Sequence, residues 1–174
     1  MLHLPDGMPA ANAEILAVPN DLSDAVLWQS STADDGSTEV PHRLDGAILL
    51  IKHANAASLA RMWHAADVHR ARTWQLSNAA APLNVQVIDT SQHPARFAHV
   101  VVWIDGIPLR GRALRFLAGA AAVTDRDGYW RAMSLGGQTY AILALREFRT
   151  QVPQSLAQTI AIPGTSDVSV RVVE

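Results

Sequence analysis

The chain has 174 residues, of which 49% are hydrophobic and 17% are charged, and its formal net charge is -2. This length holds one large domain or two small ones of roughly 80 to 90 residues each. The weak net charge disfavours nucleic-acid partners, and the absence of cysteine excludes disulfides, thiolate zinc sites and a cysteine nucleophile.

In the first half of the chain, apolar residues alternate with polar ones over short stretches bounded by turn residues, which predicts half-buried β-strands. Residues 34–36 (Asp-Asp-Gly) predict a hairpin turn, because glycine takes the positive φ that other residues resist. Residues 54–74 are the one stretch that favours a helix, since Leu59, Met62 and Trp63 recur at helical spacing. The strands expected here are residues 13–17, 25–29, 37–41 and 47–51.

The second half follows the same pattern with shorter loops. Residues 78–82 have the composition of a linker, and Asp127-Gly128 marks another hairpin turn. In a later strand Tyr140 and Ile142 are expected to face one way, and residues 151–158 predict a loop or one helical turn. The strands expected here are residues 83–88, 97–104, 113–116, 129–133, 140–144 and 168–172.

Two turn signals occur twice in the same order. Asp6-Gly7-Met8-Pro9 returns as Asp105-Gly106-Ile107-Pro108, and Thr32-Ala33-Asp34-Asp35-Gly36 returns as Thr124-Asp125-Arg126-Asp127-Gly128. The duplication predicts one small β unit used in tandem, with the two Asp-Gly pairs at equivalent turns. These residues suit backbone turns rather than a reaction, so they predict architecture and not activity. The expected units are residues 1–77, a β-sandwich with a C-terminal helix, and residues 78–174, a second β-sandwich.

The second copy carries a longer set of motifs. Residues 102–111 (Val-Trp-Ile-Asp-Gly-Ile-Pro-Leu-Arg-Gly) are followed by Leu114, Thr124, Asp127-Gly128, Gly137, Tyr140 and Ile142. This order resembles the carboxypeptidase regulatory-like, or transthyretin-like, β-sandwich domain, which has an Asp-Gly-x-Pro-Leu-x-Gly-Ala turn, a Thr-Asp-x-(Asp/Asn)-Gly hairpin and a Gly-x-Tyr-x-Leu strand. In the first copy the resemblance is looser, because Ala10 replaces the leucine, Asn12 the second glycine and Ile48 the tyrosine.

The resemblance implies two small Greek-key sandwiches of a kind that serves as an accessory, spacer or binding module and usually has no active site. One enzymatic relative, the transthyretin-related hydroxyisourate hydrolase, relies on a histidine and arginine cluster and on a C-terminal Tyr-Arg-Gly-Ser tail. This chain ends Arg171-Val172-Val173-Glu174, so the resemblance does not extend to that activity.

No residue pattern predicts a catalytic, cofactor or metal site. His64 and His69 flank Asp67 but are five residues apart, which would place them on different faces of a helix. The acidic pairs Asp34-Asp35 and Asp125/Asp127 suit turns and lack the further acidic ligands of a calcium site. There is no nucleophile elbow, phosphate-binding glycine loop or His-Glu-x-x-His motif, so we expect no catalytic residue, cofactor or metal.

Five tryptophans either fill small cores or form a sugar-stacking platform. Tyr129 and Trp130 are the candidate recognition surface, because an aromatic pair beside a turn is harder to bury than one in mid-strand. The tryptophans are Trp28, Trp63, Trp74, Trp103 and Trp130.

Taken together, these features predict a non-catalytic structural or interaction protein. It would self-associate or bind protein partners in a larger particle, such as a phage virion or tail, or a secretion apparatus. The alternative is a carbohydrate- or surface-binding module that uses exposed tryptophans, with carbohydrate as its partner, and a hydrolase is the weakest interpretation. No signal-peptide pattern is seen, and apolar runs are shorter than the roughly 20 residues of a membrane span. We therefore expect cytoplasmic synthesis, incorporation into a virion or extracellular particle, and no membrane insertion.

Overall fold

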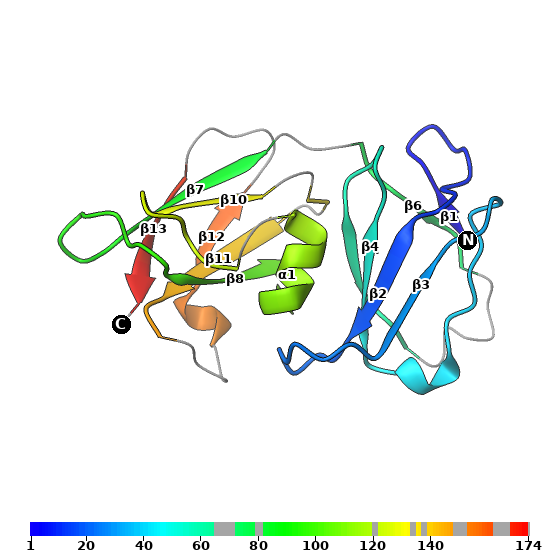
Figure 1. Ribbon diagram of the computed structural model, residues 1–174, viewed down its shortest axis with the longest axis horizontal. Helices are drawn as coiled ribbons and strands as arrows, with labels where there is room; N and C mark the ends of the chain where they lie inside the picture. The colour runs from blue at the N-terminus through cyan, green and yellow to red at the C-terminus, as the bar shows by residue number, and fades with distance from the viewer. Residues whose placement is uncertain are drawn as a thin grey trace.

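The computed structural model describes residues 1–64, 72–78, 82–119, 122–132, 135–136, 139–147, 153–161 and 168–173. Within these ranges the chain is mainly β, as the sequence predicts, with one α-helix, α1 (Gly111–Ala118). Figure 1 shows two groups of strands with α1 between them. We call the strands up to residue 78 the first unit and those from residue 82 onward the second unit.

The first unit has a four-stranded antiparallel sheet and a two-stranded parallel layer. Its strands are β1 (Leu2–His3), β2 (Glu14–Val18), β3 (Trp28–Ser31), β4 (Ile48–Lys52), β5 (Leu59–Met62) and β6 (Trp74–Gln75). The sheet has the order β3-β2-β4-β5, the layer pairs β1 with β6, and a short 3-10 helix, η1 (His42–Leu44), precedes β4. The strands predicted at 13–17 and 47–51 are confirmed as β2 and β4, and the strand predicted at 25–29 begins later, as β3.

Both faces of this sheet are buried. On one face, Ile15 and Ile51 pack with Leu2 of the two-stranded layer. On the other, Leu16 and Leu50 belong to a core shared with the second unit. Because successive strand residues point to opposite faces, a strand covered on both sides is apolar throughout. β2 is therefore buried from its second residue onward and is not the half-buried strand that the sequence predicts.

The second unit contains the remaining strands and a 3-10 turn. They are β7 (Leu83–Ile88), β8 (His99–Ile104), β9 (Ile107–Leu109), β10 (Tyr129–Ala132), β11 (Thr139–Leu145), η3 (Gln154–Leu156), β12 (Gln158–Ala161) and β13 (Val168–Val173). The strands are linked in the order β10-β7-β13-β11-β8-β9, with β12 paired to β11. The strand predicted at 83–88 is confirmed residue for residue, and Tyr140 and Ile142 share one core as predicted.

Helix α1 connects the cores of the two units. Leu114 and Leu117 are buried in the cluster that contains Leu16 and Leu50 of the first unit and Val85 of the second. Polar contacts reinforce this packing. The hydroxyl of Ser58 donates to Leu117 O (2.9 Å), Arg110 Nε donates to Leu22 O (2.5 Å), and Arg112 N donates to Asp24 Oδ1 (2.7 Å).

The predicted helix at 54–74 is wrong over the residues that the structure describes. Residues 59–62 form β5, which pairs with β4, and Trp74 begins β6. Residues 65–71 of the prediction lie outside the described residues. A short apolar run with mixed spacing fits either a helix or a strand, so pairing with β4 determines that residues 59–62 form a strand.

The predicted strand at 113–116 is also wrong, because these residues belong to α1. The buried residues of α1 recur as two adjacent pairs four residues apart, which is a helical period. Gly119 ends the helix in the left-handed conformation (φ 63°), and its N–H donates to Arg115 O (3.0 Å). The buried residues are Ala113, Leu114, Leu117 and Ala118.

The turns that follow Thr32 and Thr124 have the same hydrogen bonds. Thr32 Oγ1 donates to Ala10 O (2.5 Å) and accepts from Ala13 N (2.8 Å). Leu2 N donates to Gly36 O (2.8 Å). In the second unit the matching bonds are Thr124 Oγ1 to Ala95 O (2.6 Å), Ala98 N to Thr124 Oγ1 (2.9 Å) and Val87 N to Gly128 O (2.7 Å). Leu2 therefore occupies the place that Val87 has in the second unit.

The two Asp-Gly motifs, however, do not lie at equivalent turns, contrary to the prediction. Gly7 N donates to Leu4 O (2.9 Å) in a turn ahead of β2. Asp105-Gly106 forms the hairpin between β8 and β9, with φ values of 49° and 83°. The counterpart of the first turn is instead the one in which Gln92 N donates to Asp89 O (3.2 Å). Asp-Gly suits any turn with positive φ, so its recurrence does not fix an alignment.

Candidate functional site

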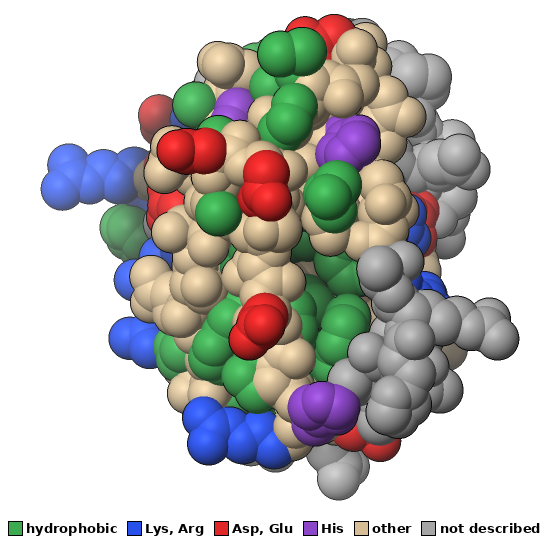
Figure 2. Space-filling view, turned by 90° about the vertical axis from the view of Figure 1, so that its right-hand side faces the viewer, with side chains coloured by type: hydrophobic (Ala, Val, Ile, Leu, Met, Phe, Trp, Pro, Cys, Tyr) green, Lys and Arg blue, Asp and Glu red, His purple; other side chains and the backbone are tan. Residues whose placement is uncertain are grey.

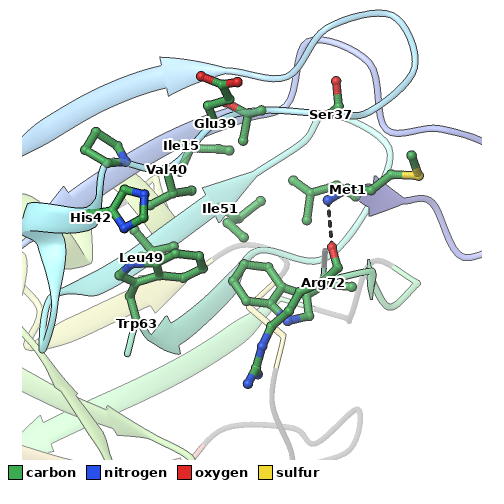
Figure 3. Close-up of a pocket in the computed structure, with 14 residues that line it drawn as sticks. Met1, Ile15, Ser37, Glu39, Val40, His42, Leu49, Ile51, Trp63 and Arg72 are labelled. Carbon is green, nitrogen blue, oxygen red and sulfur yellow. Dashed lines mark hydrogen bonds between the residues drawn. The ribbon is translucent and has the colours of Figure 1, made fainter. Parts of the chain in front are cut away.

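A pocket of about 650 Å³ opens in the first unit, beside the two-stranded layer. Figure 2 faces this end of the molecule and shows apolar side chains in a hollow. Ile15, Leu49 and Ile51 contribute to its walls from β2 and β4, and Leu2 contributes from β1 (Figure 3). Its volume lies in the range of clefts that hold ligands, roughly 300 to 1,000 Å³.

Two tryptophans line the pocket. The rings of Trp63 and Trp74 meet edge to face, with 6.3 Å between centroids and 87° between planes. Trp63 is 7% exposed, and its Nε1 is buried with no hydrogen-bond partner among the described residues. A buried N–H without an acceptor is costly, so this donor marks a position where a bound group could accept a hydrogen bond.

The rim of the pocket is polar. Ser37 and Glu39 lie on one side and Arg72 on the other, and the nitrogen of Met1 donates to Arg72 O (2.7 Å) across one edge (Figure 3). His42 also lines the pocket. The site thus has apolar walls and a rim of polar and charged side chains.

Residues 37–40 form the outer side of the pocket. The sequence predicts a strand at 37–41, but these residues form no β-ladder with any described residue. Ala33 N donates to Ser37 O (2.9 Å), just as Asp125 N donates to Tyr129 O (2.8 Å) ahead of β10. Residues 37–40 therefore take the place of β10 in the first unit, without the strand partner that β10 has.

That partner is the first part of β7. β10 pairs antiparallel with residues 83–86, and Leu83 and Val85 are 5% and 0% exposed. Since Leu2 corresponds to Val87, β1 supplies only the counterparts of the last two residues of β7. The pocket lies where the second unit has the start of β7, and sequence reasoning missed it because the Asp-Gly motifs misaligned the two units.

Trp130 does not belong to a recognition surface, contrary to the prediction. It is 1% exposed and pairs with Val85 of β7, so its ring fills the core of the second unit. Tyr129 is half-buried, and the guanidinium of Arg131 lies over its ring at 4.9 Å from the centroid. None of the five tryptophans is fully exposed: Trp63, Trp103 and Trp130 are buried, and Trp28 and Trp74 are half-buried.

Two of the glycines that the sequence places in hairpin turns have left-handed backbone conformations. Gly36 and Gly128 have φ values of 75° and 76°, and a Cβ on either would press against backbone. The aspartates of these turns cap backbone N–H groups: Asp35 Oδ1 accepts from Ser37 N, and Asp125 Oδ1 accepts from Asp127 N and Tyr129 N. Asp6 does the same for Met8 N.

These bonds give one aspartate of each acidic pair, Asp35 and Asp125, a role in its turn. The Tyr129 N–H, followed by the Arg131 side chain, holds the pKa of Asp125 below its ordinary value of 3.8. The pKa of Asp35 is lowered by its hydrogen bonds from Ser37. Across the described residues no group of three or more metal-ligating side chains is found. His64 is exposed, while Asp67 and His69 lie outside the described residues.

One exposed residue was not singled out by the sequence. Phe97 is 60% exposed and has a positive φ of 54°, which is unusual for a bulky side chain. Its counterpart in the first unit is Asn12, with φ 57°. Each of the two precedes an alanine, Ala98 or Ala13, whose N–H donates to the Oγ1 of the turn threonine. Strained residues on a surface are candidates for recognition.

No helix of the described chain has the length and apolar character needed to span a bilayer.

Comparison with known proteins gives no family. No family model matches the chain, and a search of curated proteins finds no match. Similar solved structures include the minor pilin GBS52 of Streptococcus agalactiae, with a TM-score of 0.39 and 13% identity over 95% of this chain and 83% of that chain. They also include a streptococcal ancillary pilin, with a TM-score of 0.41 and 14% identity over 98% of this chain and 60% of that chain. The shaft pilin spaA of Lactobacillus rhamnosus GG has a TM-score of 0.38 and 13% identity over 92% of this chain and 84% of that chain. At such low identities and scores, these similarities identify neither a family nor a function for the chain.

Proposed function

We propose that this chain is a non-catalytic structural protein that acts by associating with other protein subunits in a larger particle, such as a phage virion or tail, or a secretion apparatus. The observation that carries the proposal is the pocket of the first unit. There, apolar walls lie beside residues 37–40, which form no β-ladder with any described residue. Unpaired strand edges beside apolar surface are a common basis of subunit association.

We further propose that the chain consists of two copies of one β unit, as the matching bonds of Thr32 and Thr124 support. The boundary of the expected units, 1–77 and 78–174, is part of this proposal. The resemblance to carboxypeptidase regulatory-like domains is kept as an expectation for the second copy, whose Tyr140 hydroxyl donates to Leu135 O (2.8 Å) from the core. If the resemblance holds, the two copies would serve as an accessory or spacer module in the larger particle.

Sedimentation over a wide range of concentration tests the association. We expect the average mass of the chain to rise with concentration, and Val40→Glu to reduce this rise because it places a charge in the pocket wall. Val26→Glu is the matched control, since Val26 is 38% exposed and does not line the pocket. A chain that stays monomeric throughout and binds no co-purifying partner would contradict the proposal. It would favour the carbohydrate-binding alternative, which glycan-array binding would then test.

A further inference from the structure

We propose that the pocket binds an extended segment of a neighbouring polypeptide, which adds to the two-stranded layer as a strand between residues 37–40 and β6. The inference rests on the proposed function and names the form of the partner. Its template lies within the same molecule: in the second unit, β7 runs between β10 and β13 and pairs with both.

The template sets the direction of the added strand. β7 is antiparallel to β10 and parallel to β13, and β1 is likewise parallel to β6. A segment placed as β7 is in the second unit would therefore run antiparallel to residues 37–40 and parallel to residues 72–73, which lead into Trp74. Its backbone would supply the ladder partners that residues 37–40 lack.

The template also sets the side-chain pattern. Leu83 and Val85 of β7 are buried while Asn84 between them is half-buried, so the segment needs apolar residues at its first and third positions. Those two side chains would enter the pocket against the wall that Ile15 and Ile51 form together on one face of the sheet (Figure 3). A backbone carbonyl or polar side chain of the segment could then accept from Trp63 Nε1, which has no partner among the described residues.

One difference between the units predicts a larger residue at the third position. Trp130 lies directly opposite Val85, and both are buried. The place of Trp130 is taken by Thr38, which also lines the pocket. Since threonine is much smaller than tryptophan, the segment has room for an aromatic residue where β7 has Val85.

The test uses acetylated, amidated peptides added to the full chain. The first probe is Pro-Leu-Asn-Phe, which copies residues 82–85 except for the aromatic at the third strand position; it stops there because Met1 already takes the place of Gln86. The second, Pro-Asp-Asn-Asp, keeps the length and loses the apolar pattern. Calorimetry should show at least tenfold tighter binding of the first, and the NMR signal of the Trp63 indole N–H, assigned with Trp63→Phe, should shift. Equal binding of both peptides would overturn the proposal.

Two variants locate the binding. Thr38→Trp supplies the ring present at Trp130 and should abolish binding of the first peptide, because the added ring takes the room left for its phenylalanine. Thr90→Trp, at an exposed turn of the second unit, should leave that binding unchanged. Should Thr38→Trp fail to fold, an alternative is to place Leu-Asn-Val directly before Met1. This extension should raise Tm by about 3 °C or more and block the peptide. An Asp-Asn-Asp extension should do neither.

The outcomes separate the two proposals. If the chain associates and the filled-pocket variants associate equally well, strand addition is wrong and association by another surface stands. If the peptide binds at Trp63 but the chain binds no protein, the pocket accepts a strand and the structural function is wrong. Peptide binding together with association that is lost in the filled-pocket variants would support both.

Discussion

At the scale of single residues, the sequence located the tight turns well because their chemistry is local. The positive φ of Gly36 and Gly128 follows from the Asp-Gly hairpin pattern alone. What could not be predicted is which turns correspond between the units, since that depends on hydrogen bonds from Thr32 and Thr124 to residues about twenty to thirty positions earlier. The pocket depends on that correspondence, so it was not predictable from turn motifs.

Gly128 and Gly119 form a matched pair for testing how closely the backbone of a neighbouring strand approaches the glycine. Both have left-handed φ values, but a Cβ on Gly128 would lie 2.7 Å from Val87 O, whereas one on Gly119 would meet nothing within 4 Å. Gly128→Ala should lower the free energy of unfolding by roughly 1 to 3 kcal/mol, and Gly119→Ala by roughly 1 kcal/mol. Urea denaturation of both variants measures the difference. Equal losses would show that the Val87 carbonyl can move away.

Phe97 and Asn12 occupy matching positions with left-handed backbone conformations, and of these two residue types asparagine adopts that conformation at the lower cost. Phe97→Asn should therefore raise the free energy of unfolding by roughly 1 kcal/mol, since an exposed ring gives up little burial. The reciprocal change Asn12→Phe should lower it by a similar amount. A loss of stability in Phe97→Asn would mean that the ring contributes contacts that outweigh its backbone strain.

Tyr140 makes the fold sensitive to alkali. Burial, and secondarily the charge of Asp105, raises the pKa of Tyr140 from 10.0 to about 12. The unfolded chain then releases this proton at lower pH than the folded chain, so the stabilisation is complete below pH 10 and is lost as pH rises through 12. Thermal denaturation between pH 9 and 12 should show this decline, and Tyr140→Phe should flatten it. An unchanged decline in the variant would assign it to other groups.

At the scale of elements, alternating patterns predicted strands reliably where one partner strand decides the structure. β7, β8 and β13 lie within one or two residues of their predictions. The predictions were wrong where tertiary contacts determine the secondary structure. Residues 59–62 form strand β5 because they pair with β4, and α1 is stabilised by packing in the core that both units share. The eight residues of α1 are too few to form a stable helix in isolation.

Helix α1 should therefore be sensitive to loss of its buried face. Leu114 is 0% exposed and packs in the core shared by the two units, so Leu114→Ala should lower the free energy of unfolding by roughly 2 to 5 kcal/mol. Arg115→Ala changes an exposed neighbour in the same helix and should cost less than about 0.5 kcal/mol. Chemical denaturation measures both. A small effect of Leu114→Ala would mean that the surrounding core closes over the cavity.

At the scale of the whole molecule, one buried cluster runs from Leu16 and Leu50 of the first unit through α1 to Val85 and Val170 of the second. The first sheet therefore has a large apolar face that the second unit covers, and separating the units would expose it to water at a cost that grows with its area. This arrangement differs from two sandwiches joined by a linker, in which each core would be closed.

We accordingly expect the two units to unfold together. In calorimetry the whole chain should show one transition, with the calorimetric enthalpy equal to the van't Hoff enthalpy. Leu114→Ala should shift that single transition to lower temperature without splitting it, because the residue belongs to the shared core. Two resolved transitions in the parent chain would contradict this expectation and would show that each unit is stable without the other. A single transition would instead mean that a strand added to the pocket of the first unit also stabilises the second, since both belong to one cooperative fold.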